Sequence, residues 1–204
     1  PKFRVKVETE RSWYLPGDTV KGTVRADYFF GKTVEGGKVE LEYSTFAGEE
    51  AKLGTWTGKT DASGTARFEL TLPQAFHGID LLRGDAPLLL RVKVTDAAEH
   101  PQEANASLTV AREAIRIVLV PESGRLVPGV ENILYVLTTY PDGRPAQCQV
   151  SLEPMLPAFR TNMLPPEALS VTTDETGLAQ VTTRPDNRGS GFQSVKATDA
   201  AGNA

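Results

Sequence analysis

The side chains that could support catalysis are few and lie far apart along the chain. Nucleophilic catalysis by serine or cysteine requires a histidine within hydrogen-bond reach of both the nucleophile and an acid. The sequence contains two histidines, His77 and His100, which fall in predicted loops, and no Gly-x-Ser-x-Gly elbow surrounds any serine. The single cysteine, Cys148, falls in a predicted strand, where a small buried hydrophobic side chain is its usual role. We therefore expect no enzyme activity.

Carboxylates that could act in pairs or bind metal fall in turn contexts instead. A short acidic side chain in such a position hydrogen-bonds its own backbone. The alternative is a calcium ion bridging two turns, but a shell of roughly six to eight oxygens would need more carboxylates than any one loop offers. No glycine-rich phosphate loop precedes a helix. We expect neither metal nor cofactor at these aspartates, which are Asp61, Asp96, Asp142, Asp174 and Asp199.

Composition narrows the classes of partner. The chain has 204 residues, a formal charge of −4 and 24% charged residues, with lysine and arginine scattered through it. This balance gives no electrostatic reason to bind nucleic acid. No apolar run approaches the roughly 18 residues that span a bilayer, so no direct membrane contact is expected. Because the sequence begins at Pro1 rather than Met, we expect a piece of a longer protein.

A sequence motif in the first part of the chain recurs 112 residues later. Pro16-Gly17 recurs as Pro128-Gly129, and Tyr28 recurs as Tyr140 with the same spacing. A period of this length matches one small domain rather than a solenoid repeat. The sequence therefore predicts two tandem domains, residues 1–111 and residues 112–204.

The first copy alternates apolar and polar residues in short runs separated by Gly, Pro and Asp turns. This period of two is typical of strands with one face in a core. The segment 73–87 breaks the alternation and is expected to be a long loop or a helical turn. Seven short strands without helical periodicity indicate an antiparallel β-sandwich of immunoglobulin or fibronectin type. The expected strands include 3–7, 20–28, 38–43, 53–57, 66–72, 88–94 and 104–110.

The second copy repeats this pattern and then stops early. Ile115, Ile117 and Leu119 should point inward, as should alternate residues from Leu134 to Tyr140. Residues 155–169 are expected to form an irregular loop in place of the strand at 53–57, and strands are expected at 178–183 and 192–198. Because three residues follow Ala201, we predict that this seven-stranded sandwich lacks its last strand and leaves an unpaired edge.

One feature of the second copy predicts an interaction surface. If the residues that face the core are those given by the alignment of the two copies, five apolar side chains on the first two strands of the second copy point outward. The first copy has charged residues at such positions. A contiguous apolar patch usually marks an interface. The alternative is a slipped register, or burial on both faces. We expect this patch to pack on another domain of the same polypeptide; its members are Val118, Val120, Ile133, Tyr135 and Leu137.

The run from Tyr14 through Pro16-Gly17-Asp18 to Val34, followed by Gly37-Lys38-Val39, resembles the macroglobulin domains of alpha-2-macroglobulins, particularly the bacterial ones. In the second copy, Val127-Pro-Gly129, the run from Tyr140 to Ala146 and Thr173-Asp-Glu-Thr-Gly177 resemble the next domain of that series. The phrase Tyr28-Phe-Phe-Gly-Lys32 suggests the third and fourth macroglobulin domains.

The resemblance implies a structural piece of a broad-spectrum endopeptidase inhibitor that traps proteases after they cut a bait segment. The expected partners are other domains of the parent chain and, through the whole protein, target proteases. It also implies a periplasmic, cell-surface or extracellular location. The thioester motif of the family, Cys-Gly-Glu-Gln, does not occur, since Cys148 is followed by Gln149-Val150.

A different hypothesis is a tandem adhesive or carbohydrate-binding module of a bacterial surface protein. Sugar sites in such modules present exposed aromatic side chains. The aromatics proposed for this role are Trp13, Trp56 and Phe159.

Overall fold

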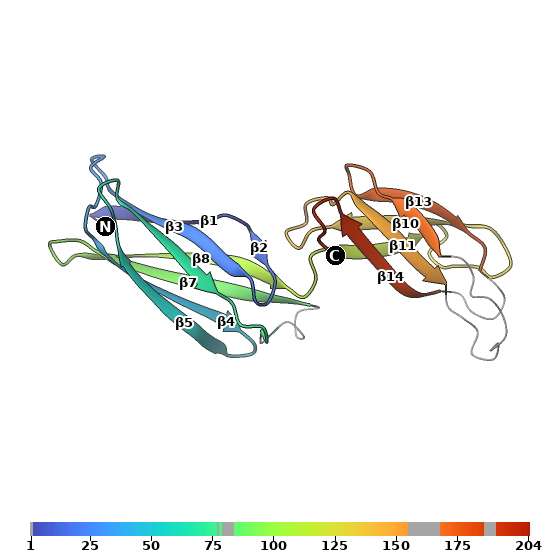
Figure 1. Cartoon of the computed structure of the whole chain (residues 1–204), viewed down its shortest axis with the longest axis horizontal. Coiled ribbons are helices and arrows are strands. Elements are labelled where there is room, and N and C mark those ends of the chain that lie inside the picture. Colours follow the sequence, from blue (N-terminus) through green and yellow to red (C-terminus); the bar gives the residue numbers. More distant parts are fainter. Residues whose placement is uncertain (1, 77, 79–83, 155–167, 186–190) are drawn as a thin grey trace. The chain divides into compact units, whose positions relative to one another are not determined.

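The chain folds into strands throughout the part that its computed structural model describes, which is residues 2–76, 78, 84–154, 168–185 and 191–204. No helix occurs in these residues, and accordingly none there is long and apolar enough to cross a membrane. The chain divides into two compact units, Pro1–Arg112 and Glu113–Ala204, one residue from the predicted boundary. The all-β prediction is confirmed (Figure 1).

The first unit is a sandwich of two sheets. One sheet has the order β1-β3-β6 and the other the order β2-β8-β7-β4-β5. Pairing is antiparallel except between β2 and β8. The strands are β1 (Phe3–Thr9), β2 (Trp13–Tyr14), β3 (Thr19–Tyr28), β4 (Lys38–Phe46), β5 (Glu50–Lys59), β6 (Thr65–Thr71), β7 (Asp85–Thr95) and β8 (Pro101–Ala111).

Alternation along these strands places the apolar side chains between the two sheets. On β7, four alternate apolar residues, Leu88, Leu90, Val92 and Val94, are all at most 1% exposed. Alternate residues of β3 and β6 are also buried, and they pack with those of β7 in one continuous core. The alternation expected for these strands thus places one face in the core, and the polar residues of the other face point to water.

The second unit repeats the first with fewer strands. Its sheets have the orders β13-β10-β9 and β12-β11-β14, which correspond to β6-β3-β1 and β5-β4-β7 of the first unit. Leu134, Val136, Val150 and Leu152 are buried in its core, as expected. The strands are β9 (Arg116–Pro121), β10 (Asn132–Thr139), β11 (Cys148–Pro154), β12 (Leu169–Thr172), β13 (Leu178–Thr183) and β14 (Phe192–Asp199).

Three segments differ from the sequence prediction. No strand was predicted at Trp13–Tyr14, where the short strand β2 pairs with β8. The strand β7 begins at Asp85, so the end of the expected 73–87 loop is a strand. Proline is tolerated at position 87 because β4 pairs with β7 only from Leu88 onward, which leaves β8 as the one strand beside Pro87. Likewise the short strand β12 pairs with β11 in the position of β5. The expected loop reached into this strand, and most of it, residues 155–167, lies outside the described residues.

The last strand of the second unit is an edge. In the described part of the chain, β14 has β11 as its one neighbouring strand, and no strand follows Asp199. In the first unit the equivalent strand, β7, lies between β4 and β8. The observation agrees with the expected unpaired edge, which stays a prediction for the chain as a whole.

A candidate docking face on the second unit

The predicted apolar face is built by the sheet β13-β10-β9. In its antiparallel register Val120 lies opposite Tyr135, and Val118 lies opposite Leu137. Residues directly opposite in such a pair have their Cβ atoms about 5 Å apart on the same face of the sheet. Leu134 and Val136, which alternate with Ile133, Tyr135 and Leu137 along β10, are buried in the core. The outer face of the sheet is therefore shared by Ile133, Tyr135 and Leu137 with Val118 and Val120 of β9.

Exposure shows that the face is open to solvent in the isolated unit. Val118 is 55% exposed, Val120 is 42% exposed and Leu137 is 38% exposed, while Ile133 and Tyr135 are half-buried. The structure adds a residue that the sequence analysis did not assign to the patch. Leu178 of β13 lies opposite Leu137 and is 39% exposed. The alternation along β13, with Ala179 buried, would have placed it outward. We call these six residues the apolar face.

The matching face of the first unit is charged. Lys6 and Glu8 form an ion pair along β1, and they occupy the positions of Val118 and Val120 at the same offset of 112. Lys21 pairs with Glu69 across β3 and β6, at an N–O distance of 4.0 Å, and Arg25 pairs with Asp27 at 2.8 Å. Such exposed pairs contribute little to stability, but they keep a sheet face hydrated. The two units therefore share a core pattern and differ in what this sheet presents to its surroundings.

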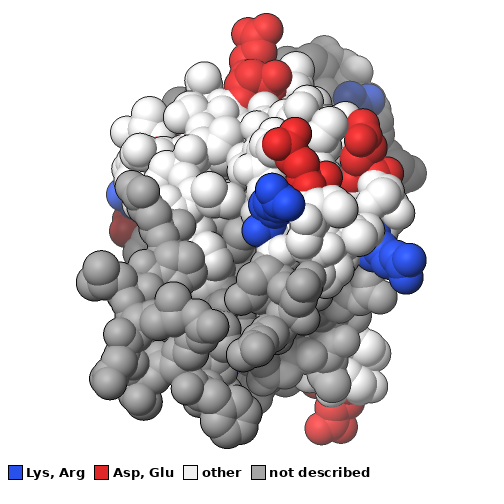
Figure 2. Space-filling view, turned by 90° about the vertical axis from the view of Figure 1, so that its right-hand side faces the viewer, with Lys and Arg blue, Asp and Glu red and all other residues white. Residues whose placement is uncertain are grey.

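Charge does not mark a binding surface on the side of the molecule seen in Figure 2. The described surface there carries a few lysine or arginine and aspartate or glutamate side chains, with the two signs interspersed among uncharged residues. A nucleic-acid site would need a patch of clustered positive charge.

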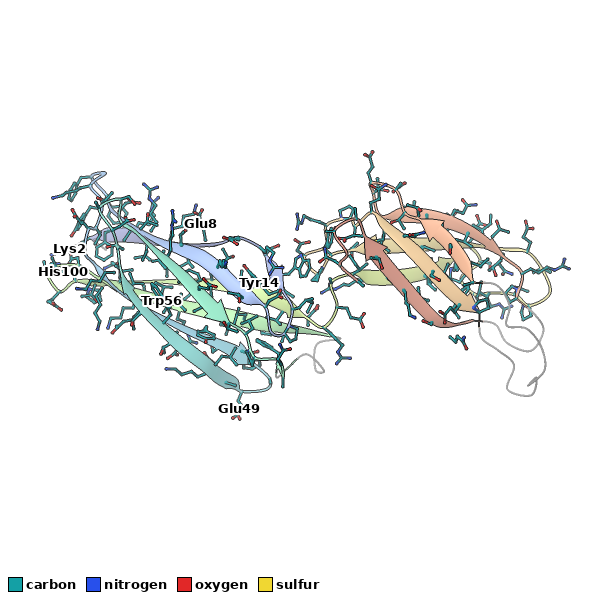
Figure 3. All side chains as sticks on the ribbon, viewed as in Figure 1. Lys2, Glu8, Tyr14, Glu49, Trp56 and His100 are labelled. Carbon is teal, nitrogen blue, oxygen red and sulfur yellow. The ribbon has the colours of Figure 1, made fainter. Side chains whose placement is uncertain are left out.

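The histidine and acid that the sequence analysis considered for catalysis form a turn instead. Asp96, whose side chain is 2% exposed, accepts hydrogen bonds from the backbone N–H groups of Ala98 and His100 and from the Tyr28 hydroxyl, at 2.9 to 3.0 Å. The His100 ring nitrogen Nδ1 lies 3.4 Å from the carboxylate, and Lys2 Nζ lies 2.7 Å from Nε2 (Figure 3). Burial alone would raise the pKa of Asp96, but these hydrogen bonds outweigh it and lower the pKa. His77 lies outside the described residues.

The second unit contains the same arrangement without a histidine. Asp199 accepts from the backbone N–H groups of Ala201 and Asn203, from the Asn203 amide and from the Tyr140 hydroxyl. Burial opposes these bonds here too, and their sum lowers the pKa of Asp199. An arrangement that recurs with asparagine in place of histidine is a structural feature of the turn, because asparagine cannot serve as a general base.

The remaining predicted turn aspartates also bond to their own backbone. Asp61 accepts from the Ser63 hydroxyl and from the N–H groups of Ser63 and Thr65, and these bonds lower its pKa, the Ser63 hydroxyl most. Asp174 repeats the pattern with Thr176 and Leu178. Among the described residues, no group of three or more His, Cys, Asp or Glu side chains could hold a metal ion.

Cys148 is a core residue. Its side chain is 1% exposed and packs with the apolar residues of the second unit. Burial is the largest effect on its thiol and raises the pKa. Since the thiolate is the reactive form, this environment suppresses nucleophilic chemistry.

The aromatics proposed for sugar binding do not form a surface cluster. Trp13 is buried, and Trp56 is half-buried against Phe68, with ring centroids 6.2 Å apart. Phe159 lies outside the described residues. In the described part of the chain three other aromatic side chains are exposed. Phe29 and Phe30, just after β3, are 58% and 75% exposed, and Phe46 at the end of β4 is 49% exposed.

Comparison with known proteins agrees with the fold described above. The model of the macroglobulin domain MG3 matches residues 1–75. The chain is 26% identical over 147 residues to the alpha-2-macroglobulin of Thermotoga maritima, an alignment that covers 71% of this chain and 9% of that protein. The native conformation of Escherichia coli alpha-2-macroglobulin shares the fold, with a TM-score of 0.51 and 9% identity, over 98% of this chain and 16% of that one.

Proposed function

We propose that this chain belongs to the bacterial alpha-2-macroglobulin family and is a framework piece of a broad-spectrum endopeptidase inhibitor that traps proteases. The match to the domain MG3 supports the domain type of the first unit, and the repeat supports a fourth macroglobulin domain for the second. Because the chain spans a small part of its curated relative's length, trapping is proposed for the parent protein and scaffolding for this part. A periplasmic, cell-surface or extracellular location belongs to the same proposal.

The observation that carries the proposal is the apolar face. Four of its side chains, Val118, Val120, Leu137 and Leu178, are more than a third exposed. Covering them would remove roughly 250 Å² of apolar surface from water, which is on the order of 6 kcal/mol as an upper bound. A sheet that presents such a face to solvent is unfavourable alone and favourable as one side of a domain interface. We propose that another domain of the parent chain covers it.

The experiment transfers the hydrated surface of the first unit to the second. Val118→Lys with Val120→Glu reproduces the Lys6 and Glu8 pair at matching positions. In the isolated chain we expect the free energy of unfolding to change by less than about 0.5 kcal/mol, because both positions face solvent. In the full-length parent we expect faster hydrogen exchange in β9 and β10 and reduced protease trapping. The matched control is Lys6→Gln with Glu8→Gln, which should leave both unaffected.

The proposal would be abandoned if the parent protein showed unprotected, solvent-exposed side chains at Val118 and Leu137. Full trapping by the Val118→Lys, Val120→Glu variant would have the same consequence.

The carbohydrate-binding alternative has less support. Two of its three aromatics, Trp13 and Trp56, contribute to packing. Of the exposed aromatic side chains in the described residues, Phe30 is already engaged in a stack with Tyr28, with centroids 5.1 Å apart.

A further inference from the structure

A sequence motif in β8 has no part in the framework role proposed above. Asn105-Ala106-Ser107 has the form Asn-x-Ser with a residue other than proline in the middle, which is the acceptor motif for N-linked glycosylation. The motif occurs once in the sequence, and an acidic residue, Glu103, stands two positions before the asparagine. Such a triplet has a function only where the asparagine can be reached and a sugar has room, and the structure answers both points.

The motif lies on the outward side of β8. Glu103, Asn105 and Ser107 are exposed, while Ala104 and Ala106 between them are half-buried. Because alternate residues of a strand share one face, an acid, an amide and a hydroxyl form a row that faces solvent. The opposite parity would have turned Asn105 toward the core, where no sugar could be accommodated.

Asparagine is an unusual choice for this position. It pairs with Arg91 near the middle of the long antiparallel ladder between β7 and β8. Asparagine is depleted in strands, whereas threonine, which occupies outward positions 55 and 57 of the same sheet, is favoured there. A residue that opposes the local preference is expected where it has a function.

Space for a sugar begins at Asn105. A groove of about 380 Å³ extends over the outer face of the sheet, and its lining reaches from Asn105 across β7 and β4 to β5. Glu42, Arg91 and Thr55 line it and offer the donors and acceptors that sugar hydroxyls bond. The Arg91 guanidinium is paired with Glu50 at an N–O distance of 2.7 Å, and Asn105 opposite it is exposed.

We propose that Asn105 is an N-linked glycosylation site whose oligosaccharide lies over this groove. In the reaction, the Asn105 amide nitrogen forms a bond to the anomeric carbon of a lipid-linked oligosaccharide donor. The bond from that carbon to the donor's pyrophosphate oxygen breaks, the lipid pyrophosphate leaves, and the amide releases one proton. Because the β8 backbone is paired along its length in the folded unit, the transfer precedes folding. The proposal rests on the periplasmic, cell-surface or extracellular location proposed above.

Trypsin isolates the site in one peptide. Cleavage after Lys93 and after Arg112 releases residues 94–112, in which Asn105 is the one asparagine. The full-length parent protein is purified separately from the cytoplasmic fraction and from the extracytoplasmic fractions of its own cells, and this peptide is analysed by mass spectrometry. We expect the extracytoplasmic protein to give a peptide heavier by the mass of an oligosaccharide, and fragmentation to locate that mass on Asn105.

Two variants of the parent protein, expressed in the same cells, test the motif itself. Ser107→Ala leaves Asn105 in place and removes the hydroxyl that the motif requires, so we expect complete loss of the added mass. Ser107→Thr is the matched control, because it changes the same exposed position and keeps a hydroxyl, so we expect the added mass to remain.

The possible results separate the site from the location. An extracytoplasmic parent protein whose peptide is unmodified would overturn the glycosylation site and leave the location standing. A parent protein confined to the cytoplasm would overturn both. Added mass that fragmentation places on a serine or threonine, or that survives Ser107→Ala, would also overturn the site.

Discussion

Replacing Tyr28 by phenylalanine should destabilise the first unit more than Tyr140→Phe destabilises the second. Both hydroxyls donate to a turn aspartate, Tyr28 to Asp96 at 2.9 Å and Tyr140 to Asp199 at 2.8 Å. The two carboxylate oxygens differ in the donors that they keep once the tyrosine hydroxyl is removed. The Asp199 oxygen keeps a second donor, the Asn203 amide at 2.8 Å, whereas the Asp96 oxygen keeps only a His100 contact of 3.4 Å.

The magnitude follows from this difference. A hydrogen bond to a charged group contributes about 1.5–3 kcal/mol net, and a buried acceptor left without its donor is at the upper end. The Asp96 side chain is 2% exposed, so water does not replace the lost donor. We expect Tyr28→Phe to cost about 2.5 kcal/mol and Tyr140→Phe about 1 kcal/mol, since the Asn203 amide still satisfies the same oxygen.

Denaturation in urea can follow the two units separately. Both tryptophans, Trp13 and Trp56, belong to the first unit, so tryptophan fluorescence reports its unfolding alone. Hydrogen exchange of β10 and β11 amides reports the second unit. Because both substitutions remove one hydroxyl from otherwise similar turns, each serves as the control for the other. Equal costs, or a larger cost for Tyr140→Phe, would refute the assignment of the difference to the second donor.

The same bond makes a prediction about pH. The folded-state pKa of Asp96 is lowered, so its contribution to stability is present above the unfolded value of about 3.9 and is lost as pH falls through the folded pKa. Tyr28→Phe removes one of the bonds that lower this pKa. The stability of the variant should therefore decline less steeply below about pH 4 than that of the unmodified first unit.

Two further predictions concern the second unit. Gly177 and Gly143 both have positive φ, 75° and 84°, but a Cβ at Gly177 would lie 2.3 Å from the Thr138 carbonyl oxygen and one at Gly143 would meet nothing within 4 Å. Gly143→Ala should cost about 1 kcal/mol and Gly177→Ala at least about 3 kcal/mol in urea unfolding; equal costs would contradict the steric explanation. Cys148 should react with a thiol reagent at least a hundredfold more slowly in the native chain than in urea, because it is buried with a raised pKa; rapid native reaction would show that its strand opens locally.

The core could be predicted from sequence because alternation alone determines which side of a strand faces the interior. The residues from Leu88 to Val94 show this, since every second one is buried as expected. Strand ends were less predictable. Pro87 is compatible with a strand only where one neighbour is missing, and the sequence does not display the neighbours. The short run Leu169–Thr172 becomes a strand through its pairing with β11, which also depends on residues far away in the chain.

The outward direction of the apolar-face side chains on β9 and β10 could be predicted because the repeat transferred the first unit's alignment to the second; that they form an interface stays a prediction. Val118 and Leu137 point outward as the offset of 112 required. Leu178 belongs to the apolar face because β13 pairs with β10, and the sequence prediction considered only the first two strands of the unit. The bond between Tyr140 and Asp199 could not be found from local pattern, because it joins residues 59 positions apart.

The two units keep the same interior and turns while their outer surfaces differ, and this locates the functional distinction between them. A core position must accept an apolar side chain in either unit, because the opposite sheet covers it. An outward position is constrained only by what it contacts. Charged residues such as Lys6 and Glu8 are typical of a face in water, and for Val118 and Val120 at the same positions we propose a covering partner. The apolar face leaves hydrophobic side chains exposed in the second unit, and our proposal that another domain covers it accounts for this difference from the first unit.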